Sequence, residues 1–340
     1  MVKRFTLCTL TLVLAASLLV GQALSQAAGK VAMLLPGSIN DQSWNASGYA
    51  GLQKLKADGM EIAYSENVAA ADQVEAMKDY ARRGFNPVIG HSGRYFSPAQ
   101  RVAPEFKSTI FLVGAGNSGF GDNVGAIDYA SEQFGYLLGV LGARMTKTGK
   151  IGAVAGLEGL PNMVALNGGY RLGARSVKPD IEVKVIYLQS MEDPAAAKEA
   201  ALALAAGGVD FISGRLNAGH AGLVQAAKEK GFWVTGRSFG HTAIAPERVI
   251  TNVVENWPDM YVAAMKEMKA GKLGGRFIQY GFHTVASAGT SGSDLRQSAE
   301  RAFHPVVPGA VIAELQGLQK KIGSGEIKIA PTKEDARGGV

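Results

Sequence analysis

Strand-like segments recur along the chain in two sets with nearly the same spacing. They begin at residues 30, 60, 87 and 109 in the first set, and at residues 150, 181, 209 and 232 in the second. By subtraction, the successive spacings are 30, 27 and 22 residues, and then 31, 28 and 23. Each spacing accommodates one strand, one helix and two short loops, the size of a right-handed βαβ unit. The sequence therefore predicts an α/β protein of two Rossmann-like lobes, each with a parallel sheet flanked by helices.

The two lobes are expected to enclose a cleft, because ligands of open parallel sheets bind outside the carboxyl ends of the strands. We assign residues 28–146 to an N-terminal lobe with a returning segment at about residues 254–273. Residues 147–252 form a C-terminal lobe with a tail segment at about residues 276–335. The chain after Gly271 resembles neither half, so hinge segments that cross between the lobes are expected there.

The first residues are typical of a secretory signal peptide. Lys3 and Arg4 precede an apolar run over residues 5–20, and small residues follow at 23–25. The run is shorter than the ~20 residues that span a bilayer. We predict that residues 1–25 are removed, with cleavage near Ser25, and that the mature protein is periplasmic.

The single cysteine, Cys8, lies inside this leader. A lipoprotein cysteine would have to follow the apolar run, so the chain is not expected to be a lipoprotein. The mature chain then has no disulfide, thiol nucleophile or cysteine metal site. Loss of Lys3 and Arg4 removes two of the six net positive charges, and no block of basic residues remains. The small remaining net charge and the absence of a basic block argue against nucleic acid as a partner.

Residues 114–119 match the dinucleotide-binding pattern G-x-G-x-x-G after a predicted strand. That pattern requires a helix at its last glycine, whereas residues 124–129 are predicted to be extended. No cofactor is therefore expected. Three glycines, Gly135, Gly139 and Gly142, lie along one flank of a helix that begins at Ser131, and we interpret them as a helix-packing surface.

Residues 90–94 resemble the nucleophile elbow G-x-S-x-G, but Arg94 replaces the final glycine. One hypothesis is a secreted serine hydrolase with Ser92 as its nucleophile. The other is that Ser92, Arg94 and Tyr95 donate hydrogen bonds to a ligand at a strand end, where His91 is a further candidate contact. The five histidines are scattered without paired spacing, so no metal site is predicted.

The loop over residues 37–45 concentrates a carboxylate, amides, a hydroxyl and an indole after the first strand. Trp44 offers a flat apolar face, and Asn45 offers a donor and an acceptor to the edge of a heterocycle. Asp41 and Ser43 are the other candidate ligand contacts here. The same residues also suit core packing, a turn and a helix cap, and their chemistry leaves both interpretations open.

The motif D-x-S-W-N-x-x-x-x-x-G over residues 41–51 resembles the D-x-S-F-N-x-x-x-x-x-G motif of the basic membrane protein (BMP, PnrA-like) family. These are ABC-transporter substrate-binding proteins. The likeness continues over residues 136–156, 168–204 and 222–231, so it covers nearly the whole mature chain. It implies the type I periplasmic binding protein fold.

The resemblance also implies a function without catalysis. A monomeric receptor would trap a small molecule between its lobes by hinge closure and deliver it to an ABC-transporter permease in the inner membrane. The resemblance implies three ligand contacts. Trp44 would stack on a purine, Asn45 would bind the edge of the base, and Asp41 is the third. A sensing module that reports to a membrane signalling partner remains an alternative.

Two departures from the family pattern bear on the ligand. An aspartate-rich loop is replaced by residues 236–241, which include Arg237, and a family lysine is replaced by Glu255. Arg237 and Glu255 are candidate ligand contacts at these positions. In the second lobe, Leu216 and Asn217 follow a strand and are candidate contacts. A purine base without its sugar, or another flat polar heterocycle, is therefore at least as well supported as a nucleoside.

Overall fold

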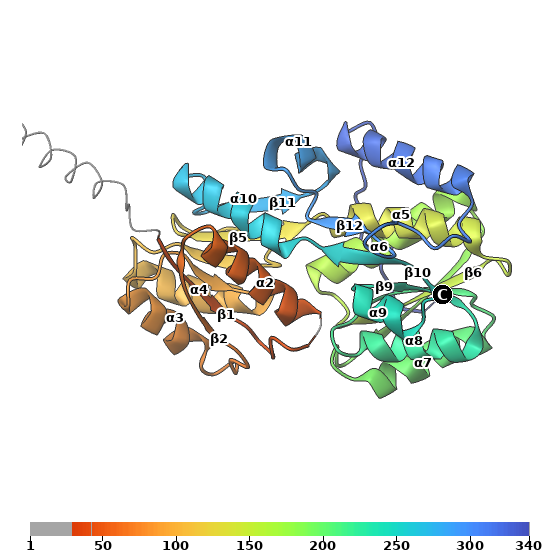
Figure 1. Ribbon diagram of the computed structural model, residues 1–340, viewed down its shortest axis with the longest axis horizontal. Helices are drawn as coiled ribbons and strands as arrows, with labels where there is room; N and C mark the ends of the chain where they lie inside the picture. Colours follow the sequence, from red (N-terminus) through yellow and green to blue (C-terminus); the bar gives the residue numbers. More distant parts are fainter. Residues whose placement is uncertain (1–28, 42, 340) are drawn as a thin grey trace, which may run out of the picture.

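The computed structural model describes residues 29–339 of the chain except Gln42 (Figure 1). The predicted signal peptide and Cys8 lie outside these residues. The described chain forms two six-stranded sheets, each flanked by helices, so the two-lobe α/β prediction is confirmed.

The first sheet has the strand order β11-β5-β4-β3-β1-β2, and its neighbouring strands are all parallel. Long apolar runs account for its central strands, which are buried on both faces. The strands are β1 (Lys30–Leu34), β2 (Glu61–Ser65), β3 (Val88–Gly90), β4 (Phe111–Gly114), β5 (Val124–Tyr129) and β11 (Phe277–Tyr280).

The second sheet repeats this plan with the order β12-β10-β9-β8-β6-β7. Only its last strand, β12, runs antiparallel to its neighbour among the described pairings. The strands are β6 (Lys150–Gly156), β7 (Glu182–Leu188), β8 (Phe211–Arg215), β9 (Trp233–Gly236), β10 (Val249–Glu255) and β12 (Ser293–Leu295).

Helices cover both faces of each sheet. The outer face of the first lobe carries α3 (Gln73–Arg82), the short 3-10 turns η1 (Gly93–Tyr95) and η2 (Ala103–Glu105), and α4 (Phe96–Val102). The outer face of the second lobe carries α7 (Pro194–Ala206), α8 (His220–Lys230) and α9 (Phe239–Ile244). No helix in residues 29–339 is both long and apolar enough to span a bilayer.

Two helices cross between the lobes after the fifth strand of each sheet. Helix α5 (Ser131–Met145) follows β5 but packs on α6 (Pro161–Val177), which follows the first strand of the other sheet. Conversely, α10 (Trp257–Lys269) follows β10 but packs on α2 (Trp44–Ala57), as Figure 1 shows. The sixth strand of each sheet also comes from beyond α10. Neither lobe is therefore one continuous stretch of chain.

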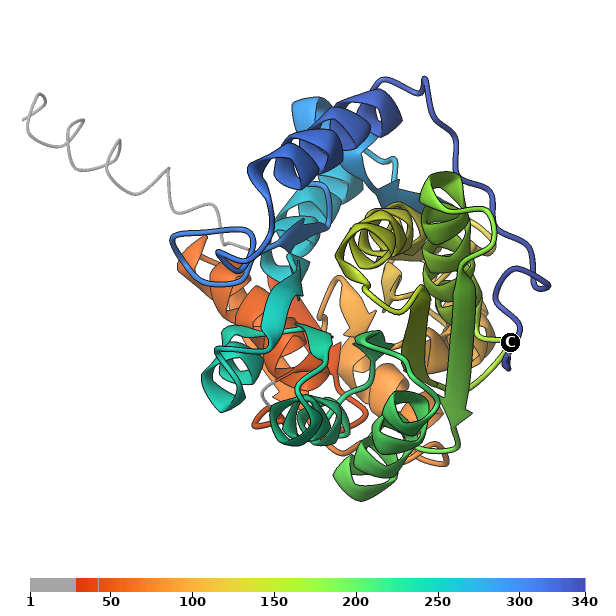
Figure 2. The ribbon, with the colours of Figure 1, turned by 90° about the vertical axis from the view of Figure 1, so that its right-hand side faces the viewer.

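The tail divides between the two lobes. The predicted tail segment at residues 276–335 was assigned to the second lobe, but β11 pairs with β5 of the first sheet. It covers backbone groups that would otherwise lie free at the edge of β5. Beyond it are η3 (Phe282–Thr284), α11 (Val285–Ala288) and α12 (Gly309–Gly323), which packs on α5. Figure 2 shows the last residues running down the second lobe, where Gly339 pairs with Val185.

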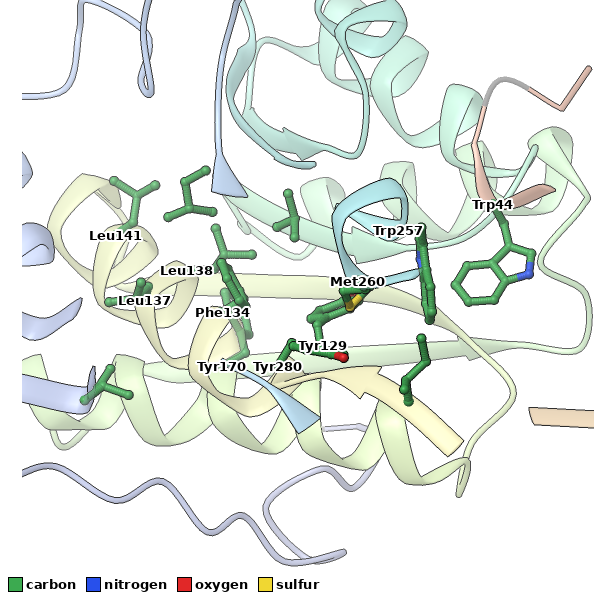
Figure 3. Close-up of a cluster of buried hydrophobic side chains, with 14 of the residues drawn as sticks. Trp44, Tyr129, Phe134, Leu137, Leu138, Leu141, Tyr170, Trp257, Met260 and Tyr280 are labelled. Carbon is green, nitrogen blue, oxygen red and sulfur yellow. The ribbon is translucent and has the colours of Figure 1, made fainter. Parts of the chain in front are cut away.

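One hydrophobic cluster extends through both lobes. It joins Ile89 of the first sheet to Phe211 of the second through buried side chains of α5 and α10. Figure 3 shows part of this cluster, from Leu141 and Phe134 to Trp257 and Trp44. In each lobe, one further cluster lies under the outer helices. The crossing helices thus share the largest core of the molecule.

Glycines allow α5 and α6 to pack backbone against backbone. A Cβ atom at Gly139 would lie 2.0 Å from the carbonyl oxygen of Tyr170, and one at Gly173 would lie 2.0 Å from that of Tyr136. These distances are far below van der Waals contact. The predicted packing role of the glycine flank is confirmed: Gly135 and Gly139 face α6, and Gly142 faces Phe211 and Ile151 in strands of the second sheet.

We expect Gly139→Ala to lower the free energy of unfolding by about 1–3 kcal/mol, because the added methyl group forces α5 away from α6. Gly317→Ala is the matched control, since a Cβ atom at this position in α12 meets nothing within 4 Å. It should leave stability unchanged or raise it by up to ~1 kcal/mol. Urea unfolding followed by circular dichroism measures both, and equal stabilities would contradict the packing argument.

Candidate functional site

A cavity of about 720 Å³ lies between the two lobes. Loops that follow strands line it from both sides, as expected for parallel sheets. Its volume falls in the range of small-molecule sites. Seven predicted site residues border this cavity, namely Asp41, Trp44, Asn45, Ser92, Arg94, Asn217 and Arg237. Five predicted residues are not among those that line it, namely Ser43, His91, Tyr95, Leu216 and Glu255.

Trp44 forms part of the first-lobe wall of the cavity and is held from behind. Its indole stacks on the imidazole of His91, with ring centroids 4.2 Å apart and an angle of 16° between the planes. The indole Nε1 donates to the carbonyl oxygen of His91 at 2.9 Å. The rings of Trp44 and Trp257 are nearly perpendicular, with centroids 5.0 Å apart (Figure 3). Trp44 therefore serves both the core and the cavity wall.

His91 supports Trp44 rather than bordering the cavity. It is fully buried, its Nε2 lies 3.0 Å from the carbonyl oxygen of Trp44, and its Nδ1 lies 2.6 Å from the hydroxyl of Tyr261. Because a carbonyl oxygen only accepts, Nε2 carries the proton and Tyr261 donates to Nδ1. Burial lowers the pKa of His91 to about 4, so the ring is neutral at pH 7.

The loop before α2 is organised by Asp41. Its carboxylate accepts hydrogen bonds from the backbone N–H groups of Ser43, Asn45 and Ala46, and from the side-chain Nδ2 of Asn45. The Oδ1 of Asn45 accepts from the backbone N–H of Gly37 at 3.1 Å. Asp41 thus caps the start of α2 and orders the loop, and Asn45 borders the cavity.

The next loop separates the four residues that the sequence grouped together. Ser92 and Arg94 border the cavity, and the Ser92 Oγ accepts from the backbone N–H of Arg94 at 3.3 Å. Tyr95 points into the first-lobe core and is fully buried. Both ring nitrogens of His91 are engaged elsewhere, so His91 offers no base to Ser92. The arrangement does not support the hydrolase hypothesis.

The second lobe contributes Asn217 and Arg237 to the cavity. Asn217 Nδ2 donates to the carboxylate of Glu192, which also borders the cavity. Leu216 is fully buried in the second-lobe core, and its carbonyl oxygen accepts from Arg237 Nη1 at 2.6 Å. Leu216 therefore positions Arg237 through its backbone.

Glu255 is the centre of a buried ion cluster beside the cavity. Its side chain is only 5% exposed and accepts hydrogen bonds from Arg237, from the Tyr129 hydroxyl at 3.1 Å and from Trp257 Nε1 at 2.7 Å. Arg215 Nη2 lies 3.7 Å from the same carboxylate. Burial opposes the charge, but Arg237 and Arg215 outweigh it and hold the pKa of Glu255 at about 2.

Two buried charged residues at the cavity, Asp128 and Arg215, were not predicted as site residues. Both lie at the carboxyl ends of strands, in β5 and β8, whereas the predicted contacts lie in the segments that follow strands. A polar residue at the end of a buried apolar run is the signal that could have found Asp128. Among the described residues, no group of three histidine, aspartate or glutamate side chains is arranged to hold a metal ion.

Comparisons with known proteins show which family and which relatives the chain is similar to. A family model described as "ABC transporter substrate-binding protein PnrA-like" matches residues 28–286. The chain is 28% identical over 314 residues to a purine-binding protein of Brucella abortus, covering 90% of this chain and 89% of that one. It is 26% identical over 264 residues to the transcriptional activator protein med of Bacillus subtilis, covering 77% and 82%.

A solved structure agrees with these relatives. The ABC transporter solute-binding protein of Conexibacter woesei superposes with a TM-score of 0.70 and 26% identity, covering 89% of this chain and 99% of that one. The family resemblance of residues 41–51 and the type I periplasmic binding protein fold are both confirmed.

We expect Glu255→Gln to lower the free energy of unfolding by about 3–5 kcal/mol, because it leaves Arg237 and Arg215 buried without a countercharge. The control Glu314→Gln removes a half-exposed pair with Arg144 and should cost at most about 1 kcal/mol. Chemical unfolding at pH 7 compares them, and equal losses would contradict the cluster's role.

The same cluster gives a pH dependence of stability. Folding lowers the pKa of Glu255 from 4.5 to about 2. The stability from its charge is therefore complete above pH 4.5 and is lost as the pH falls toward 2. Glu255→Gln should flatten this part of the curve of stability against pH.

Proposed function

Because the chain belongs to the PnrA-like family of ABC transporter substrate-binding proteins, we propose that it is an exported receptor for a purine-like ligand, a nucleobase or a nucleoside. Members of this family bind small molecules outside the cytoplasm for an ABC permease, and they are binders rather than enzymes. Periplasmic release after cleavage near Ser25, without a lipid anchor and as a monomer, is part of the same proposal.

The observation that carries the purine assignment is the flat indole of Trp44 at the wall of the cavity. Its backing by His91 and Trp257 presets the plane on which an aromatic ring can stack. Stacking between a base and an aromatic side chain contributes about 1–3 kcal/mol. The similarity to a purine-binding protein over 90% of this chain adds independent support.

The ion cluster favours a base over a nucleoside. In this chain the Glu255 carboxylate is paired with Arg237 and does not line the cavity, so no carboxylate at this position is free to bind ribose hydroxyls. Glu255, which replaces the family lysine, thus pairs with Arg237, which lies in the segment that replaces the acidic loop. A free nucleobase requires fewer polar partners, and Asn45 and Asn217 border the cavity, each with one side-chain N–H engaged in a hydrogen bond to a carboxylate and one outside the described hydrogen bonds.

Thermal-shift measurements with a panel of nucleobases, nucleosides, sugars and amino acids test the ligand class, because a bound ligand raises apparent stability by mass action. We expect nucleobases to raise the melting temperature most. If another class does so and no purine does, the assignment fails.

Trp44→Ala should weaken purine binding roughly tenfold to a hundredfold through loss of stacking, and Trp44→Phe should retain most of the affinity. Tyr64→Ala is the control, since Tyr64 is an exposed aromatic of the first lobe that does not line the cavity. Titration calorimetry compares the dissociation constants. Unchanged affinity in Trp44→Ala would remove Trp44 from the binding surface.

Hinge closure is the proposed response to the ligand. Both lobes border the cavity, while Arg94 and Leu160 at its rim remain exposed, with Leu160 39% accessible. A ligand that contacts both lobes shifts the population toward a closed form. Small-angle X-ray scattering should show a smaller radius of gyration with a saturating purine. An identical scattering curve would contradict closure.

A further inference from the structure

Asp128 and Arg215 are two buried, charged side chains that face the cavity from opposite lobes. Asp128 lies near the end of β5 in the first sheet and is 7% exposed, and Arg215 ends β8 in the second sheet and is 3% exposed. Burial of a charged group is unfavourable unless hydrogen bonds replace those of water. The donor and acceptor groups of Asp128 and Arg215 that no described hydrogen bond uses therefore indicate what the cavity binds.

Asp128 has unused acceptor capacity. Within the described residues, its only hydrogen bond is from the backbone N–H of the adjacent Tyr129 to Oδ1, at 2.8 Å. A carboxylate can accept about four hydrogen bonds. Since the side chain borders the cavity, a ligand N–H is the group that would complete it.

Arg215 has unused donor capacity. Nη1 donates to the Ser131 hydroxyl at 2.9 Å, and the guanidinium lies 4.8 Å from the centroid of the Tyr129 ring. Nη2 is 3.7 Å from Glu255, which is an ion pair beyond hydrogen-bond distance. Of the five N–H groups of a guanidinium, one is hydrogen-bonded within the described chain. A ligand carbonyl oxygen at the cavity would accept from another.

We propose that Asp128 and Arg215 together bind a lactam edge of the ligand, a ring N–H beside a carbonyl group. The N–H donates to the Asp128 carboxylate, and the carbonyl oxygen accepts from Arg215. This inference rests on the proposed function, and within it selects oxopurines over purines that lack the N–H. Because the two residues belong to different sheets, the same edge also joins the lobes.

The surroundings of Asp128 make this binding sensitive to pH. Burial raises the pKa of Asp128 to about 7, opposed by Arg215 and by the Tyr129 backbone N–H, while the carboxylates of Glu255 and Glu132 raise it further. A ligand N–H that donates to the carboxylate favours its ionised form. Affinity should therefore rise with pH through about 7 and level off above it, by about tenfold between pH 6 and pH 8.

Titration calorimetry with hypoxanthine, 1-methylhypoxanthine and unsubstituted purine tests the proposal on the full mature chain. Methylation at N1 removes the donor and keeps the carbonyl group, and purine lacks both. We expect hypoxanthine to bind at least tenfold more tightly than either, with the pH dependence given above.

Two variants of neighbouring carboxyl groups separate recognition from folding. Asp128→Asn should abolish the pH dependence and reduce the preference for hypoxanthine over its 1-methyl derivative, because the amide oxygen still accepts from the ligand N–H but carries no charge. Glu132→Gln is the matched control, because Glu132 neighbours Asp128, binds Gln279 and does not line the cavity. It should retain the preference for hypoxanthine and a rise of affinity with pH, with the midpoint moved to lower pH because Glu132 raises the pKa of Asp128. Circular dichroism melting of each variant establishes that it is folded at the temperature of titration.

Equal, pH-independent affinity for hypoxanthine and 1-methylhypoxanthine would overturn the lactam inference and leave the purine receptor intact. So would an affinity that rises as the pH falls, since Asp128 would then donate. If none of the three purines binds while another class does, both the inference and the proposed function fail.

Discussion

The buried ion pair between Glu255 and Arg237 is the interaction on which the architecture of the cavity depends. Its carboxylate connects the end of β10 to β9 through Arg237, to β5 through the Tyr129 hydroxyl and to α10 through the Trp257 indole. Charges at this depth are stable only when each has its partner. The ends of strands from both sheets are therefore held around one carboxylate, next to the place where the chain crosses between lobes.

The first-lobe wall is organised by a different principle, a neutral aromatic stack. A charged imidazole behind Trp44 would need a buried counterion, whereas the neutral His91 accepts from Tyr261 and donates to a backbone carbonyl. Asp41 orders the loop in front of it. The cavity therefore has an apolar wall in the first lobe and polar or charged side chains where the two lobes meet.

The paired spacing predicted the lobes because βαβ units are local, and their apolar runs are legible in the sequence. Strands β11 and β12 escaped detection, since they are short and pair with strands that lie far away in the sequence. The site shows the same division. Asp41, Trp44 and Asn45 follow from a local motif, whereas Tyr95 and His91 turn into the core because of the η1 turn and the stack. Asp128 and Arg215 lie far apart in the sequence, and only the arrangement of the two lobes brings both to one cavity.

The sixth strand of the first sheet comes late in the sequence, and this has a consequence for folding. The first sheet lacks its edge strand until residues 277–280 have been synthesised, although its other five strands end at Tyr129. Contacts so distant in sequence form slowly, because a long loop must close before they contribute. An N-terminal fragment that ends before Phe277 would therefore leave the edge of β5 unpaired. The first lobe is complete only when the chain has passed through the first five strands of the second sheet and returned.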